Sequence, residues 1–207
     1  MSRRRVVVTG LGIVSPVGIG VEAAWNNIVA GKSGTTRITQ FDASALTSQI
    51  AAEVNDFDVS KYLPAKEARR VDRFVHFGLA AAMEAIKDSG LEVTGGNRER
   101  IGAVIGSGIG GLPMIEETYR EVLKSGTRRI SPFFIPGTII NMVAGNLSIM
   151  YGLKGPNLAI VTACTTAAHC IGDAGRLMEY GDADAMIAGG AEACISSLVV
   201  GGFCAAR

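Results

Sequence analysis

The stretch LAIVTACTTAAH, residues 158–169, decides the fold of this chain and points to its chemistry. Its first part, residues 158–162, is a short apolar and β-branched run, which is typical of a buried strand. Residues 165–180 then have the pattern of a helix, and Cys164 stands between the two elements. The stretch therefore predicts a strand, a tight turn that carries a cysteine, and a helix.

The rest of the chain repeats this alternation of strands and helices. Further strands are predicted at 4–9, 101–105 and 183–188, with a possible short strand at 51–54, and further helices at 21–30, 73–89, 113–124 and 138–151. The strands are continuous apolar runs, which favours a parallel or mixed sheet covered by helices on both faces. The predicted fold class is therefore α/β, with the chemistry beyond the carboxyl ends of the strands.

Composition excludes several classes of protein. Of the 207 residues, 48% are hydrophobic, which is enough for a packed core and excludes intrinsic disorder. The 20 Lys and Arg residues nearly balance the 19 Asp and Glu residues, so no general basic field is available for nucleic acid. We expect neither a secretory signal nor a membrane span. The four cysteines lack a Cys-x-x-Cys pair, so we expect no metal site and a reduced, cytoplasmic protein.

Cys164 is the candidate nucleophile. At a helix N-terminus, free backbone N–H groups and the helix dipole favour a thiolate, which attacks acyl groups, and the same N–H groups can stabilise an oxyanion. The alternative is a buried structural cysteine, the interpretation that we give to Cys170, Cys194 and Cys204. His169 lies about 140° around the same helix, and His76 lies on another helix, so the sequence offers no evident base.

A glycine motif allows a second function. Gly106-x-Gly108-x-x-Gly111 follows a predicted strand and opens a helix, as in dinucleotide-binding sites. Such sites also need an acidic residue about 20 residues further on, and residues 125–131 contain none. A nicotinamide-dependent oxidoreductase is therefore one alternative, and a tight strand-to-helix turn is the simpler interpretation of the motif.

Eight ordered segments carry a resemblance to a known family. They are RRVVVTGLG (4–12), IGSGIGG (105–111), ISPFFIP (130–136), NMVAG (141–145), TACT (162–165), GDAD (181–184), AGGAE (188–192) and GGF (201–203). In these segments the chain resembles the N-terminal half of the β-ketoacyl-acyl carrier protein synthase II family, the condensing enzymes of type II fatty acid synthesis. The resemblance implies a thiolase-like fold of two related α/β halves. Residues 1–207 correspond to the first half, and we expect the second half to be absent from this chain.

The resemblance also implies an activity. Cys164 corresponds to the family's nucleophile, which takes an acyl chain from acyl carrier protein as a thioester. Malonyl-carrier protein then loses CO₂, and its carbanion attacks the thioester, so the chain grows by two carbons. The family's two catalytic histidines and its lysine lie in the second half, so the chain alone is expected to be inactive. The implied partners are the acyl- and malonyl-loaded carrier protein and a second copy in a homodimer, without cofactor, nucleic acid or membrane.

Two groups of residues take a role from the resemblance. The acyl pocket corresponds to four apolar residues that would otherwise be ordinary core: Ile109, Phe134, Ala163 and Phe203. The docking patch for the acidic carrier protein corresponds to six basic residues that would otherwise form a solvated face: Lys66, Arg69, Arg70, Arg128, Arg129 and Arg207. A non-catalytic ketosynthase-like partner subunit is the remaining alternative, and Cys164 argues against it because such subunits lack the cysteine.

Overall fold

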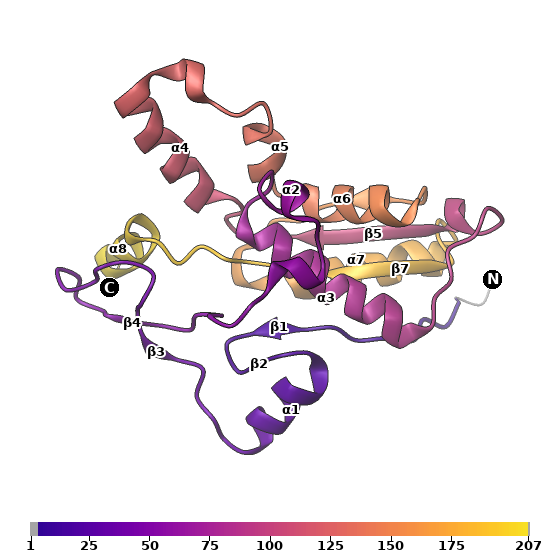
Figure 1. Ribbon diagram of the computed structural model, residues 1–207. Helices are drawn as coiled ribbons and strands as arrows, with labels where there is room; N and C mark the ends of the chain where they lie inside the picture. Colours follow the sequence, from indigo (N-terminus) through magenta and orange to yellow (C-terminus); the bar gives the residue numbers. More distant parts are fainter. Residues whose placement is uncertain (1–3, 207) are drawn as a thin grey trace.

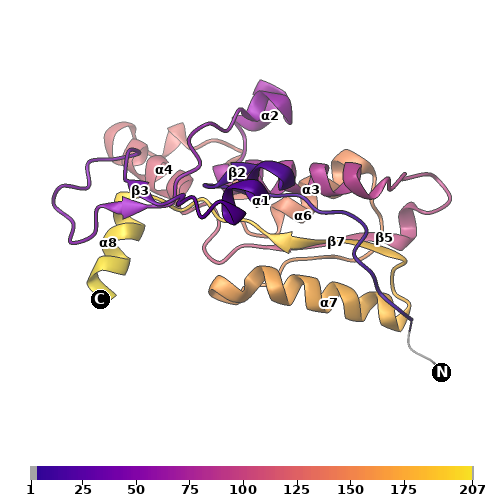
Figure 2. The same ribbon diagram turned by 90° about the horizontal axis from the view of Figure 1, so that it is seen from below.

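A parallel sheet of three strands forms the centre of the computed structural model, which describes residues 4–206. In spatial order the strands are β6 (Asn157–Leu158), β5 (Ile101–Gly106) and β7 (Ala185–Gly190). Helix α7 (Thr166–Tyr180) covers one face, and helices α3 (Arg73–Ser89) and α6 (Met142–Tyr151) cover the other (Figures 1 and 2). The predicted α/β class is confirmed, with the sheet between two layers of helices.

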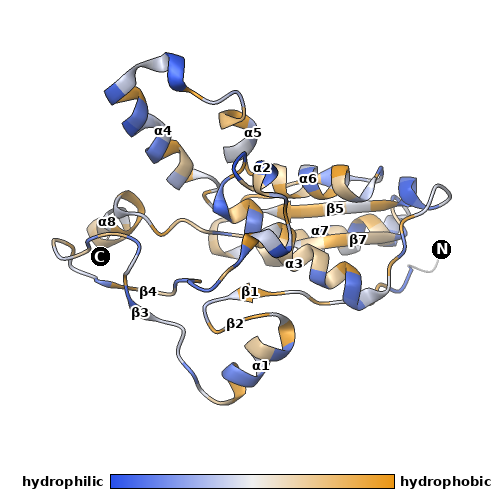
Figure 3. Ribbon diagram, in the orientation of Figure 1, coloured by the Kyte–Doolittle hydropathy of each residue, from blue (hydrophilic) through white to orange (hydrophobic). Residues whose placement is uncertain are grey.

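The two layers of core follow from the alternation of side chains along β5. Ala103 and Ile105 pack into the layer of α3 and α6, where Phe74 and Leu147 are fully buried. Val104 points the other way and packs against α7. All six residues of β5 are buried because both of its faces are covered. Figure 3 shows the contrast between the apolar strand β7 and the hydrophilic outer turns of α4 (Leu112–Ser125).

Helix α3 begins and ends where the sequence predicts. Asp72 caps its first turn, since the Asp72 carboxylate accepts a hydrogen bond from the backbone N–H of Phe74 at 3.2 Å. Gly90 ends it with a left-handed conformation at φ 65°. The predicted helix at 138–151 begins later, as α6 at Met142, because Ile139 adopts an extended conformation, and Thr138 instead ends a separate short helix, α5 (Phe134–Thr138). The predicted strand at 158–162 is also shorter, since only Leu158 belongs to β6.

The predicted strand at 4–9 is wrong. Residues 4–13 form no regular element, and Val8 is 75% exposed. The segment instead runs along α3, where the backbone N–H of Ile13 donates to Glu84 at 2.9 Å. Gly12 makes this approach possible, since a Cβ there would lie 1.9 Å from a backbone oxygen of α3. Carboxylate side chains of α3 therefore accept hydrogen bonds from backbone N–H groups that would pair with a neighbouring strand in a sheet.

Shorter elements surround this centre. They are β1 (Val14–Ser15), β2 (Gly18–Ile19), α1 (Val21–Val29), β3 (Thr36–Arg37), β4 (Ile50–Ala51), α2 (Ala65–Ala68) and α8 (Ser197–Ala206). β1 pairs with β2 and β3 with β4, both antiparallel, and the possible strand at 51–54 shares only Ala51 with β4. Within residues 4–206, none of the helices has the length and apolar character that crossing a bilayer requires.

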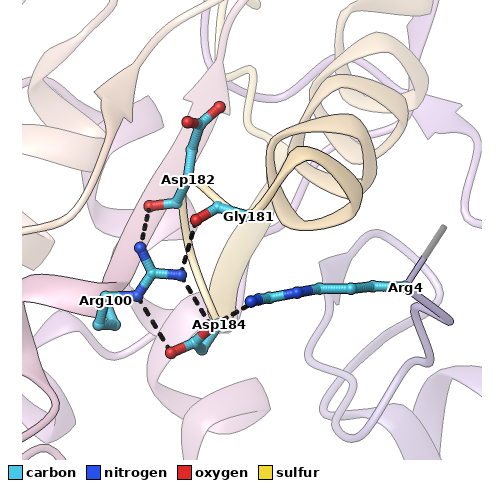
Figure 4. Close-up of polar contacts among 5 residues, drawn as sticks. All are labelled: Arg4, Arg100, Gly181, Asp182 and Asp184. Atoms are coloured by element: carbon cyan, nitrogen blue, oxygen red, sulfur yellow. Dashed lines mark hydrogen bonds and ion pairs between the residues drawn. The ribbon is translucent and has the colours of Figure 1, made fainter. Parts of the chain in front are cut away.

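A group of charged residues closes the amino-terminal end of the sheet (Figure 4). The guanidinium of Arg100 donates to both carboxylate oxygens of Asp184, at 2.9 and 3.1 Å, and to the backbone oxygens of Gly181 and Asp182. Arg4 donates to the same carboxylate at 2.8 Å. Hydrogen bonds from Arg100, which has the larger effect, and from Arg4 hold the pKa of Asp184 at about 2. The starts of β5 and β7 are thereby joined to each other and to the N-terminal segment.

Candidate active site

Cys164 lies beyond the carboxyl end of the sheet, in the turn that leads into α7. It is the middle residue of a single 3₁₀ turn, Ala163–Thr165, and α7 continues directly from this turn at Thr166. Cys164 is exposed, whereas Cys170, one turn into the helix, is completely buried. The buried structural alternative therefore does not apply to Cys164. The thiol is accessible next to the N-terminal end of a helix, as the sequence predicts.

The turn that presents Cys164 has an unusual backbone. Ala163 has a φ of 52°, and it is the only non-glycine residue with positive φ among residues 4–206. This left-handed conformation costs an L-residue about 1–2 kcal/mol, so the surrounding structure must hold it. Part of the support comes from Thr166, which is buried and whose hydroxyl accepts a hydrogen bond from the N–H of Thr162 at 2.9 Å.

Neither histidine pairs with this cysteine. His169 lies on α7, and its Nδ1 is 2.7 Å from the hydroxyl oxygen of Thr162. His76 lies in α3, where its Nε2 is 2.8 Å from the backbone oxygen of Ala68 and burial lowers its pKa. Within the part of the chain that the structure describes, no histidine is hydrogen-bonded to Cys164.

The glycine motif at 106–111 holds a carboxylate of the chain itself. Glu192, just after β7, accepts hydrogen bonds from the hydroxyl of Ser107 at 2.9 Å, from the N–H of Ile109 at 2.9 Å and from the N–H of Gly110 at 3.2 Å. In dinucleotide-binding proteins a glycine-rich turn of this kind faces a phosphate. Since a carboxylate already occupies these donors, the dinucleotide interpretation is wrong.

Three of the four predicted pocket residues lie on segments that meet at this glycine loop. On one side, Gly108 lies so close to Ala163 that a Cβ at Gly108 would be 3.4 Å from the backbone oxygen of Ala163. On the other side, the N–H of Gly111 donates to the backbone oxygen of Thr138 at 3.0 Å, in the short helix α5 that begins at Phe134. The loop that carries Ile109 therefore lies between the cysteine turn and α5.

The fourth pocket residue, Phe203, lies apart from this loop. It is on α8 and is 68% exposed. Figures 1 and 2 place α8 beside the β3–β4 hairpin. There a Cβ at Gly201 would lie 3.7 Å from Leu46, and Cys204 is hydrogen-bonded to Thr47. The role of Phe203 in an acyl pocket stays a prediction.

The predicted docking residues lie on both sides of α5. Lys66 and Arg69 are exposed on or just after α2, and Arg128 and Arg129 are exposed in the 3₁₀ turn Thr127–Arg129 between α4 and α5. Arg207 lies outside the described residues.

Arg70 differs from the other basic residues because it is already engaged. Its guanidinium donates to both carboxylate oxygens of Glu67, at 2.8 and 2.9 Å, and lies 4.1 Å from the centre of the Phe133 ring. Glu67, Arg70 and Phe133 also line a mainly apolar pocket of about 410 Å³ between α2, α5 and α6. Arg70 therefore has a structural role in joining α2 to α5.

A sequence model of the N-terminal domain of β-ketoacyl synthases matches residues 3–207. The chain belongs to this family. It is 53% identical over its whole length to 3-oxoacyl-[acyl-carrier-protein] synthase 2 of Vibrio harveyi and 56% identical to the enzyme of the same name from Coxiella burnetii, and it covers 50% of each. The chain thus spans about half the length of these relatives.

Solved structures agree with the assignment to the β-ketoacyl synthases. A β-ketoacyl synthase from Burkholderia phymatum has a TM-score of 0.83 at 26% identity, over 100% of this chain and 50% of that protein. The ishigamide ketosynthase/chain length factor has a TM-score of 0.85 at 26% identity, over 99% of this chain and 51% of that one. A ketosynthase in complex with its type II PKS acyl-carrier protein has a TM-score of 0.80, also at 26% identity. The predicted thiolase-like fold and the recognised family are both confirmed.

Sequence reasoning about this β-ketoacyl synthase domain missed the contacts of Glu192. The residue was visible in the AGGAE segment at 188–192, directly after a predicted strand and its glycines. A carboxylate at the carboxyl end of one strand, with a glycine-rich turn at the end of another, is the signal that could have found the pair. Because β5 and β7 are adjacent parallel strands, their carboxyl ends meet at one edge of the sheet.

Proposed function

We propose that this chain carries the nucleophile of a 3-oxoacyl-[acyl-carrier-protein] synthase that elongates fatty acyl chains. The Cys164 thiolate attacks the thioester of an acyl carrier protein, forms an acyl-cysteine and releases the carrier thiol. Malonyl-carrier protein then loses CO₂, and the resulting carbanion attacks the acyl-cysteine. This step forms a carbon–carbon bond, breaks the bond to Cys164 and gives a β-ketoacyl product two carbons longer.

The observation that carries the proposal is the presentation of Cys164. An accessible thiol on a strained turn, at the start of a helix, is the arrangement that nucleophilic acyl transfer needs. The backbone N–H of the same residue supplies one donor for an oxyanion. The chain's membership of the β-ketoacyl synthases and its identity of more than 50% to two synthases of this name support the same chemistry. A non-catalytic partner subunit would have no use for this cysteine.

The proposal includes the partners and the location. Acyl carrier protein docks on the exposed basic residues around α5, because carrier proteins are strongly acidic and opposite charge steers their encounter. A structural relative of this chain, a ketosynthase solved in complex with its acyl-carrier protein, supports this choice of partner. The enzyme works as a homodimer in the cytoplasm, where its four cysteines remain free thiols.

The test is acyl transfer to Cys164. The native protein is purified from the cells that produce it and is incubated with acyl-loaded carrier protein. Its intact mass and its peptide map are then measured. We expect one acyl group on Cys164 and none in the Cys164→Ala variant. The synthase of Vibrio harveyi serves as the positive control. Acylation of that enzyme under conditions in which Cys164 stays unmodified would overturn the proposal.

A further inference from the structure

The glycine loop beside Cys164 needs an anchor. Four of the six residues from 106 to 111 are glycine, and Gly110 has a φ of 75°. Glycine has more backbone freedom than any other residue, so such a loop does not hold one shape through its own sequence. Larger residues are excluded at its start, because a Cβ at Gly106 would lie 2.0 Å from the backbone oxygen of Ile160.

Glu192 supplies that anchor with both oxygens of its carboxylate. One oxygen accepts from the hydroxyl of Ser107 at 2.9 Å and from the N–H of Gly110 at 3.2 Å, and the other accepts from the N–H of Ile109 at 2.9 Å. The N–H of Gly110 also donates to the hydroxyl oxygen of Ser107 at 3.0 Å, so the donors form one connected group. Successive backbone N–H groups of this kind make a site for an anion, and hydrogen bonds to a charged acceptor are the stronger kind.

The anchored loop is in contact with the cysteine turn. A Cβ at Gly108 would lie 2.9 Å from a carboxylate oxygen of Glu192 and 3.4 Å from the backbone oxygen of Ala163, so Gly108 lies close to both. Ile109 is the next residue, and Cys164 follows Ala163. The position of Ile109 relative to Cys164 therefore depends on where Glu192 holds the loop.

We infer that Glu192 is a positioning residue that fixes the 106–111 loop against the cysteine turn and thereby sets which acyl chain lengths Cys164 accepts. The inference rests on the proposed function and deepens it, because Ile109 is a predicted wall of the acyl pocket. Glutamine cannot replace Glu192. A carboxamide has a single acceptor oxygen, and its NH₂ group would face the N–H of Ile109 or Gly110, donor against donor.

Amide hydrogen exchange tests the anchor without any assay of activity. We compare wild type with Glu192→Gln and with Glu121→Gln, which makes the same change on the exposed surface of α4. In Glu192→Gln we expect the amides of Ile109 and Gly110 to exchange about ten- to a hundredfold faster than in wild type. In Glu121→Gln we expect them to exchange at the wild-type rate. Ser107→Ala removes one bond to the same carboxylate, so it gives a smaller increase. Wild-type exchange at both amides in Glu192→Gln would overturn the inference.

A second measurement connects the anchor to specificity. Carrier proteins loaded with short, medium and long acyl chains are offered to each variant, and kcat/KM for acylation of Cys164 is measured for each length. We expect Glu192→Gln to lose about tenfold on the preferred length and to discriminate less between lengths, while iodoacetamide still alkylates Cys164 at the wild-type rate. An unchanged length profile would leave Glu192 with no role in specificity. If the wild-type protein accepts no acyl chain, the proposed function fails. The hydrogen-exchange measurement still tests whether Glu192 holds the 106–111 loop.

Discussion

At the scale of single residues, the surroundings of the four cysteines separate one candidate nucleophile from three other thiols. Burial raises the pKa of Cys170, and burial together with the charge of Glu192 raises the pKa of Cys194 to about 11. Cys204 is different, since hydrogen bonds from Thr47 and Ser48 lower its pKa. The prediction from sequence treated these three alike, because it could not see the segments that fold next to each one.

Alkylation rates should follow this order. At pH 8 we expect iodoacetamide to modify Cys164 first because it is exposed on its turn, and Cys204 second because it is half-buried with a lowered pKa. Cys170 and Cys194 should react at least tenfold more slowly than Cys164, since the pKa of each is raised, Cys170 is buried and Cys194 is half-buried. Peptide mapping after timed alkylation gives the four rates. Equal rates at all four sites would contradict an activated Cys164.

At the scale of elements, local signals in the sequence located helices better than strands. Helix α3 is predicted to the residue because its apolar residues at helical spacing and the glycine that ends it, Gly90, lie within the segment itself. The run at 4–9 has the composition of a strand, but pairing depends on a neighbour that the segment cannot specify, and the chain lies along α3 there instead. Cys164 could be identified from the sequence for the same reason as α3, since its turn and the helix that follows are consecutive in the chain.

Glu192 could not be found in this way, because its hydrogen-bond partners are distant in the sequence. The residues that donate to it lie 82 to 85 positions earlier in the chain. Only the pairing of β5 with β7 brings them together. The missed part of the site is therefore the part that depends on tertiary structure.

The elements around α5 give a test of the docking surface. Arg69, after α2, and Arg128, before α5, are exposed. We expect the double variant Arg69→Glu and Arg128→Glu to weaken binding of acyl carrier protein about tenfold at low salt, and less at high salt, because the attraction between exposed charges is screened. Surface plasmon resonance at two salt concentrations measures the effect.

The matched control for this charge reversal is Arg98→Glu, on the exposed turn Arg98–Arg100 before β5. It reverses one exposed charge away from α5, as Arg69→Glu and Arg128→Glu each do on the docking surface, so carrier-protein affinity should stay as in wild type. Alkylation of Cys164 should be unchanged in all of these variants. If the double variant and Arg98→Glu bind acyl carrier protein with equal affinity, Arg69 and Arg128 do not belong to the docking surface.

At the scale of the whole molecule, the group around Asp184 makes stability depend on pH. The pKa of this carboxyl is about 2 in the folded protein, below its ordinary value of 3.8. A lowered pKa means that the carboxylate stabilises the folded state at pH values above 3.8, and that this contribution disappears as the pH falls towards 2. Arg4 and Arg100 are the groups whose attraction is lost when Asp184 takes up a proton.

The corresponding variant is Asp184→Asn, which keeps the shape and removes the charge. We expect its Tm to be lower than that of wild type at pH 6, and the difference to shrink as the pH falls from 3.8 to about 2. Thermal unfolding followed by circular dichroism over this range measures it. Asp173→Asn, at an exposed position on α7, is the control. A Tm difference that does not change with pH would show that the ion pairs around Asp184 do not stabilise the fold.

The pairing of β5 with β7 also has a consequence for synthesis on the ribosome. Ile101 pairs with Ala185, so one central strand leaves the ribosome roughly eighty residues before its neighbour. At about 5–20 residues per second, β5 waits between about 4 and 16 seconds for that neighbour. Its six residues are all buried in the finished protein, so during this interval an apolar strand with open edges is exposed to the cell. We therefore expect the nascent chain to be most prone to wrong contacts in the interval between the emergence of β5 and the emergence of β7 from the ribosome.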